Sequence, residues 1–133
     1  MTLITEIDYN YSTISEGHMI LPVKINGKGP FQFILDTGAS HICISQQLSE
    51  KLKLSGLNSD VMGIHGTFET EITELRSVAL GKARRLKLLA AMMDISHVQE
   101  SLGIEVDGIL GYDFLKKFKI LIDYPKKKIQ IYK

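Results

Sequence analysis

The sequence has little that could cross-link the chain through sulfur or metal. Of its 133 residues only Cys43 is a cysteine, so no disulfide can form within the chain. Cys43 lies in the apolar run Ile42-Cys43-Ile44, which favours packing in the core over nucleophilic catalysis. The four histidines are scattered without the spacing of zinc ligands, which argues against a zinc site.

A strong charge of either sign is also missing. The formal net charge is +1, so no bulk field attracts nucleic acid or an anionic membrane. The short basic runs at 82–87 and 126–128 are interpreted as solvated turns. No apolar run is long enough to span a membrane, and the first residues lack the layout of a signal peptide. We therefore expect a cytoplasmic protein, although a mature domain without its targeting segment would look the same.

Short strand patterns dominate the chain. At 133 residues it is long enough for one core and too short for two, which predicts a single domain over residues 1–133. Apolar runs at 19–25 and 31–35 flank a turn-forming cluster at 26–30, and this pattern predicts a hairpin. Further strands are predicted at 42–44, 78–80, 86–93, 106–110, 120–122 and 129–132, with short helices after Ser45 and at 95–102 and 112–118. The pattern predicts an all-β, barrel-like domain with two or three short helices.

The segment 33–40 (Phe-Ile-Leu-Asp-Thr-Gly-Ala-Ser) is the most informative part of the sequence. It predicts a buried strand that runs into a tight turn carrying the Asp36 carboxylate, where solvation is difficult. Such a position favours a carboxylate whose proton affinity is tuned for chemistry. The alternative is a structural aspartate that caps a turn.

Two later segments add to this motif. Residues 108–111 (Gly-Ile-Leu-Gly) lead into a predicted helix, and a glycine-containing hairpin is predicted at 62–68. In this order and spacing, the three elements resemble the retropepsin-like aspartic proteases over residues 19–132. The resemblance implies the closed acid-protease barrel.

The resemblance also implies a mechanism. Peptide hydrolysis by carboxylates needs two of them that share one proton, so that one activates a water and the other polarises the scissile carbonyl. The chain has only one Asp-Thr-Gly, and a twofold homodimer would supply the second Asp36. The implied activity is that of an aspartic endopeptidase acting on an extended peptide or unfolded protein, with neither metal nor organic cofactor. By resemblance, Asp36 is catalytic, Thr37 and Gly38 support it, and the substrate-binding residues are Ile34, Ala39, Gly63, Ile64, His65, Gly66, Ile109 and Leu110.

The sequence departs from the viral members of the family at two places. Those members continue the motif with further acidic residues and pair them with an arginine after the later glycine. Here Ser40-His41 and Tyr112-Asp113 occupy these positions, so the chain looks closer to cellular and bacterial members.

Other interpretations stay open at this point. Asp107 is either a turn residue beside Gly108 or a second catalytic carboxylate in the same chain, and Asp123 is interpreted as a turn residue. His41 and His65 are exposed loop histidines or, for His65, a substrate contact. The rival function is a dimeric adaptor of the same fold that holds a peptide without cleaving it. A monomer that awaits a different partner chain is a third possibility.

Overall fold

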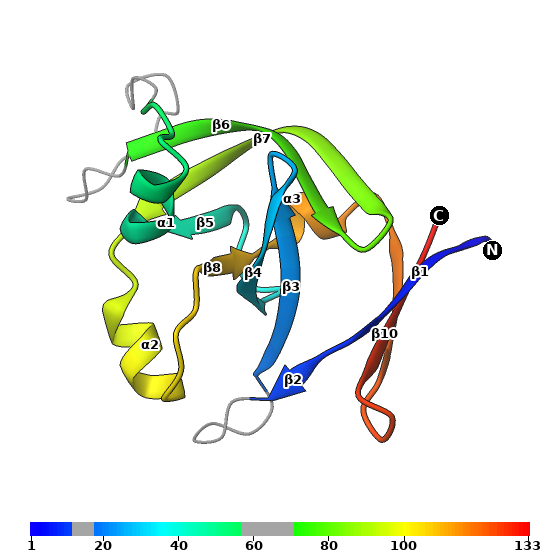
Figure 1. Ribbon diagram of the computed structural model, residues 1–133. Helices are drawn as coiled ribbons and strands as arrows, with labels where there is room; N and C mark the ends of the chain where they lie inside the picture. The colour runs from blue at the N-terminus through cyan, green and yellow to red at the C-terminus, as the bar shows by residue number, and fades with distance from the viewer. Residues whose placement is uncertain (12–17, 57–70) are drawn as a thin grey trace.

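Strands carry the architecture of this protein (Figure 1). The computed structural model describes residues 1–11, 18–56 and 71–133. The strands in this part are β1 (Leu3–Asp8), β2 (Asn10–Tyr11), β3 (Met19–Ile25), β4 (Lys28–Leu35), β5 (Ile42–Ser45), β6 (Glu71–Leu80), β7 (Ala83–Met93), β8 (Gly108–Leu110), β9 (Lys119–Asp123) and β10 (Lys128–Tyr132). The helices are α1 (Gln46–Lys51), α2 (Ser96–Leu102) and α3 (Tyr112–Leu115).

Six of these strands close into a barrel. The larger sheet has the order β2-β3-β4-β8-β5-β7-β6, and an additional pairing of β3 with β6 joins its two sides. Short β8 lies between β4, to which it is parallel, and β5, to which it is antiparallel. The all-β barrel with short helices predicted from the sequence is therefore confirmed.

Local sequence explains several element boundaries. The predicted strand at 19–25 coincides with β3, and the turn at 26–27 returns the chain into β4. The predicted N-cap is also confirmed, because the Ser45 hydroxyl accepts a hydrogen bond from the Leu48 amide at 3.1 Å. The strands predicted separately at 78–80 and 86–93 are parts of one long hairpin, β6 and β7.

A second sheet, β1-β10-β9, stands beside the barrel (Figure 1). The alternation along β10 is regular, since Ile129 and Ile131 are buried in the main core while Lys128 and Gln130 face the other way. Thr5 of β1 contacts Gly81 at the tip of the β6–β7 hairpin. The two chain ends meet here, where the Lys133 amide donates to the Thr2 carbonyl at 2.9 Å.

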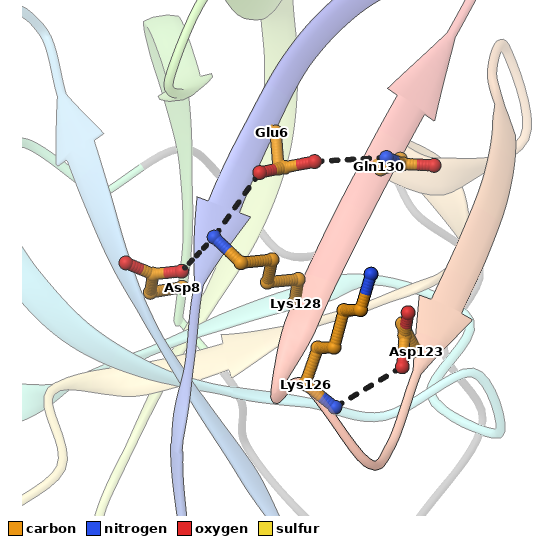
Figure 2. Close-up of polar contacts among 6 residues, drawn as sticks. All are labelled: Glu6, Asp8, Asp123, Lys126, Lys128 and Gln130. Atoms are coloured by element: carbon orange, nitrogen blue, oxygen red, sulfur yellow. Dashed lines mark hydrogen bonds and ion pairs between the residues drawn. The ribbon is translucent and has the colours of Figure 1, made fainter.

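A charged cluster connects β1 with β10 on the outer face of this sheet (Figure 2). The Lys128 Nζ lies 3.1 Å from Glu6 Oε1 and 3.0 Å from Asp8 Oδ1, while Gln130 Nε2 donates to Glu6 Oε2 at 2.8 Å. The hydrogen bond from Gln130, followed by that from Lys128, lowers the pKa of Glu6. The predicted turn role of Asp123 is confirmed, because its carboxylate accepts from the Lys126 amide at 3.1 Å (Figure 2).

This cluster predicts a pH dependence of stability. A folded-state pKa below the unfolded value means that Glu6 stabilises the fold above its unfolded pKa, and that this contribution is lost as the pH falls through its folded pKa. We expect the melting temperature of Glu6→Gln to fall less between pH 6 and pH 3 than that of the wild type. The difference should be small, because the cluster is solvent-exposed and screened by salt. Thermal unfolding at low ionic strength measures it. The control is Glu50→Gln, an exposed glutamate on α1, and equal acid-induced losses in all three proteins would contradict the role of Glu6.

The helices in the described ranges are too short and too polar for any of them to cross a membrane. The cytoplasmic location stays a prediction.

Candidate active site at the Asp36 turn

The Asp36 turn begins where two parallel strands end together. In the β4–β8 pair, Leu35 is opposite Leu110, and the Asp36 amide donates to the Leu110 carbonyl at 3.0 Å. The last residues of β4 are buried, because this strand lies in the wall of the barrel. The first residue after the strand is therefore held by a rigid element.

Hydrogen bonds inside the turn set its shape. The Gly38 amide donates to Asp36 Oδ1 at 2.9 Å, and the Ala39 amide donates to the Asp36 carbonyl at 3.1 Å. The first of these bonds orients the carboxylate. Asp36 itself is exposed in the single chain, so the expectation that it is hard to solvate is wrong for one chain alone. The reason is that the turn leaves the barrel wall immediately after Leu35.

The other side of the turn contacts the segment after β8. The Tyr112 amide donates to the Ala39 carbonyl at 2.7 Å. A methyl group on Gly111 would lie 2.7 Å from the Ala39 carbonyl oxygen and 2.9 Å from that of His41. Only glycine allows the two backbone segments to approach so closely. The Gly-Ile-Leu-Gly motif and the Asp36 turn are thus in direct contact.

Asp113 is a site residue that the sequence analysis did not identify. It is only 9% exposed, and its Oδ2 accepts from the Ile42 amide at 3.0 Å while Oδ1 accepts from the Phe114 amide at 2.8 Å. Arg85 Nη1 donates to the Asp113 carbonyl at 2.6 Å. A buried carboxylate is costly unless such bonds compensate it. Asp113 therefore fastens the start of β5, directly after the Asp36 turn, to α3.

The signal for this role was present in the sequence. Asp113 is an acidic residue inside an otherwise apolar stretch, between Leu110 and Leu115. A charge in such a stretch indicates a buried group with specific partners, here a strand amide.

Tyr112, where viral members have an arginine, is 56% exposed.

Asp107 lies at the opposite end of the β4–β8 pair from Asp36. Its Oδ2 accepts from the Gln32 amide at 2.9 Å, and its own amide donates to the Gln32 carbonyl at 2.7 Å. Gln32 precedes Asp36 by four residues, which in a strand spans about 13 Å. Asp107 is thus a hydrogen-bonding residue beside Gly108, and its carboxylate is directed to β4 rather than to the Asp36 turn.

The remaining predicted site residues fall into three groups. Ala39 and Ile109 are half-buried, whereas Ile34 and Leu110 are buried within the single chain. Gly63, Ile64, His65 and Gly66 lie outside the described residues. The expectation that all of these line a substrate cleft stays a prediction.

Cys43 and His41, which follow the Asp36 turn in the sequence, differ in burial. Cys43 is buried, as the sequence predicted, and burial raises the pKa of its thiol to about 11. Its low thiolate population and its burial make it inert. His41 is exposed, with Nδ1 3.0 Å from Ser40 Oγ. Over residues 1–11, 18–56 and 71–133, no group of three or more potential metal ligands comes together.

Comparison with known proteins agrees with this geometry. The profile of the family described as aspartyl protease matches residues 21–114, a range that runs from β3 through the Asp36 turn to α3. A comparison with curated protein sequences gave no match.

Solved structures show the same fold. A retropepsin-like aspartic protease from Rickettsia conorii is 24% identical with a TM-score of 0.62, and the alignment covers 96% of this chain and 89% of that one. The retroviral protease-like domain of Ddi1 from Leishmania major is 15% identical with a TM-score of 0.57, covering 89% of this chain and 94% of that one. With the matched family profile and the barrel that carries the Asp36 turn, this chain belongs to the aspartyl protease family and has the retropepsin-like fold.

Proposed function

We propose that this chain is an aspartic endopeptidase that acts as a homodimer of single-domain subunits, with the Asp36 carboxylates of both subunits forming one site. The proposal rests on how Asp36 is held and how exposed it is. Its carboxylate is oriented by the Gly38 amide on a turn anchored to β8, yet it remains exposed in one chain. A rigidly held, exposed acid at the end of a barrel wall is suited to meet a second copy of itself.

Asp107 of the same chain is poorly placed to serve as the second carboxylate of the site. Its carboxylate is bound to the Gln32 amide at the far end of β4. A twofold interface, by contrast, places identical residues opposite each other about the axis. Two carboxylates at contact distance cannot both ionise cheaply, so the pair holds one proton in common.

The chemistry follows from the shared proton. The ionised carboxylate takes a proton from a water, whose oxygen attacks the scissile carbonyl carbon while the protonated carboxyl donates a hydrogen bond to the carbonyl oxygen. The tetrahedral intermediate then collapses with transfer of a proton to the amide nitrogen, which leaves as an amine. Water is the nucleophile, and the two carboxyl groups return to their starting state.

The neighbouring residues receive supporting roles in this proposal. Thr37 lies next to Asp36 and would fix the two turns to each other across the axis, and Gly38 orients the carboxylate through its amide. Half-buried Ala39 and Ile109 would contact the peptide, while buried Ile34 and Leu110 would support the cleft from beneath. Gly63, Ile64, His65 and Gly66 would close over an extended peptide, whose main chain offers hydrogen bonds for affinity.

The experiment that tests this function uses an unfolded protein as substrate. The chain is incubated with it at acidic and neutral pH, with and without a statine-type inhibitor, and the products are analysed by mass spectrometry. We expect cleavage that the inhibitor abolishes. Binding of the unfolded protein without inhibitor-sensitive cleavage would contradict the proposal and favour a peptide-holding adaptor.

A further inference from the structure

A large exposed aromatic ring lies next to the Asp36 turn. Tyr112 is 56% exposed, although it sits at the start of α3 between Gly111, which is closely packed, and buried Asp113. Its amide donates to the Ala39 carbonyl at 2.7 Å. The backbone at this position is therefore an integral part of the site, while the side chain is more than half exposed and its ring centroid lies 6.0 Å from Lys116 Nζ.

Simple geometry places Tyr112 close to the proposed twofold axis. Residues at the two ends of a tight turn have Cα atoms less than about 7 Å apart, which applies to Asp36 and Ala39. The Cα atoms of Ala39 and Tyr112, which are joined by a backbone hydrogen bond between two segments, are about 5.5 Å apart. Tyr112 thus lies within about 13 Å of Asp36. A standard interface of about 800 Å² per partner has a radius of about 16 Å, so a contact centred near Asp36 reaches Tyr112.

Other exposed apolar side chains have a different setting. Leu121 of β9 stands opposite Gln130 on the outer face of the small sheet, next to the charged cluster of Glu6 and Lys128. Tyr124 lies in the turn between β9 and β10. Among the large apolar side chains that are exposed in the described part of the chain, Tyr112 is the one whose backbone is bonded to the Asp36 turn.

We infer that the Tyr112 ring is an anchor of the interface between two copies of this chain. The inference rests on the proposed function, because it requires the subunits to meet at Asp36. Tyrosine suits this position, since it buries a large rigid surface and keeps a polar hydroxyl for the rim. In a twofold dimer each subunit contributes its ring once, so one substitution removes two contacts.

The test is the dimer dissociation constant, measured by sedimentation over a range of concentrations. We expect Tyr112→Ala to raise this constant by roughly thirtyfold or more, as loss of an aromatic anchor does. Tyr112→Phe, which keeps the ring, should stay within a few fold of the wild type. The matched control is Tyr124→Ala, whose ring is 55% exposed but lies in the turn between β9 and β10, and it should leave the constant unchanged. Tyr112→Lys keeps a long side chain and places like charges across the axis, so it should dissociate the dimer even if the alanine variant folds poorly.

The outcomes distinguish a failure of the role of Tyr112 from a failure of the proposed function. A folded Tyr112→Ala or Tyr112→Lys that dimerises like the wild type overturns the role of Tyr112, and leaves the proposed function intact if the wild type still cleaves peptide. A raised KM for peptide with an unchanged dimer constant would likewise overturn it and place the ring in the substrate cleft. A wild type that is monomeric at all concentrations overturns both this inference and the shared site.

Discussion

Replacing Asp36 with asparagine is expected to lower the rate of peptide hydrolysis by about a thousandfold or more, while the dimer persists. An amide has nearly the shape of a carboxyl group, and its oxygen still accepts the hydrogen bond that the Gly38 amide now donates at 2.9 Å. It cannot take a proton from water, however, and it cannot share a proton with its partner. The rate of cleavage of a peptide library and the sedimentation of Asp36→Asn measure the two parts of this expectation.

Asp107→Asn is the matched control. It makes the same chemical change to the carboxylate that binds the Gln32 amide, and we expect it to retain nearly full cleavage activity. Equal loss of activity in Asp107→Asn and Asp36→Asn would instead indicate two catalytic carboxylates within one chain. Undiminished cleavage by Asp36→Asn would remove Asp36 from the catalytic role altogether.

Mixing the wild type with Asp36→Asn separates a shared site from independent ones. If both carboxylates of a dimer are needed, only dimers of two wild-type subunits are active. An equal mixture that exchanges subunits freely should then retain about a quarter of the activity of an all-wild-type sample at the same total concentration. Independent sites in each chain would retain about half. The activity of mixtures in several proportions therefore tests the dimeric mechanism without any structural assumption.

The second large effect is expected for Gly108→Ala. Gly108 begins β8, which lies between β4 and β5, and its backbone is confined from both sides. A methyl group there would overlap the carbonyl oxygen of Cys43 and lie 2.5 Å from the ring of fully buried Phe33. Because a backbone carbonyl and a packed ring cannot both move aside, we expect a loss of about 3 kcal/mol or more in the free energy of unfolding. Unfolding in urea, followed by circular dichroism, measures this loss.

Gly56→Ala provides the comparison for this substitution. Its new methyl group would make ordinary contacts of 3.6 Å with Glu71 and 3.7 Å with Met92. The same exchange of residue types should therefore change stability by less than about 1 kcal/mol. If Gly108→Ala is as stable as the wild type, β8 is not confined between its neighbours as described.

Much of the fold could be predicted because its signals are local. The strand at 19–25 was predicted where the structure has it, since apolar runs and turn-forming residues act on their immediate neighbours. The turn that follows was predicted too long, at 26–30, because residues 28–30 already belong to β4. The Ser45 cap is also a local device, reaching only three residues along the chain.

Strand β1 was missed because its partner is distant. Leu3–Asp8 is half polar, and its pairing with β10 joins residues at opposite ends of the sequence. The side chains that link it to β10 on the outer face, Glu6 with Lys128 and Gln130, are ordinary surface residues until the sheet brings them together. No local pattern identifies such a strand.

The sequence by itself determined the chemistry that this protein carries: a carboxylate on an Asp-Thr-Gly turn after an apolar strand, with a second glycine motif further along. The tertiary structure alone decided how β5, which follows that turn, is fastened to α3 through Asp113, whose carboxylate accepts from the Ile42 amide 71 positions away. It also decided that Asp36 is exposed in one chain and that the backbone of exposed Tyr112 is bonded to its turn. The physical reason is that the exposure of a side chain and the hydrogen bonds between distant segments of the chain depend on the insertion of β8 between β4 and β5. Neighbouring residues in the sequence do not encode this arrangement.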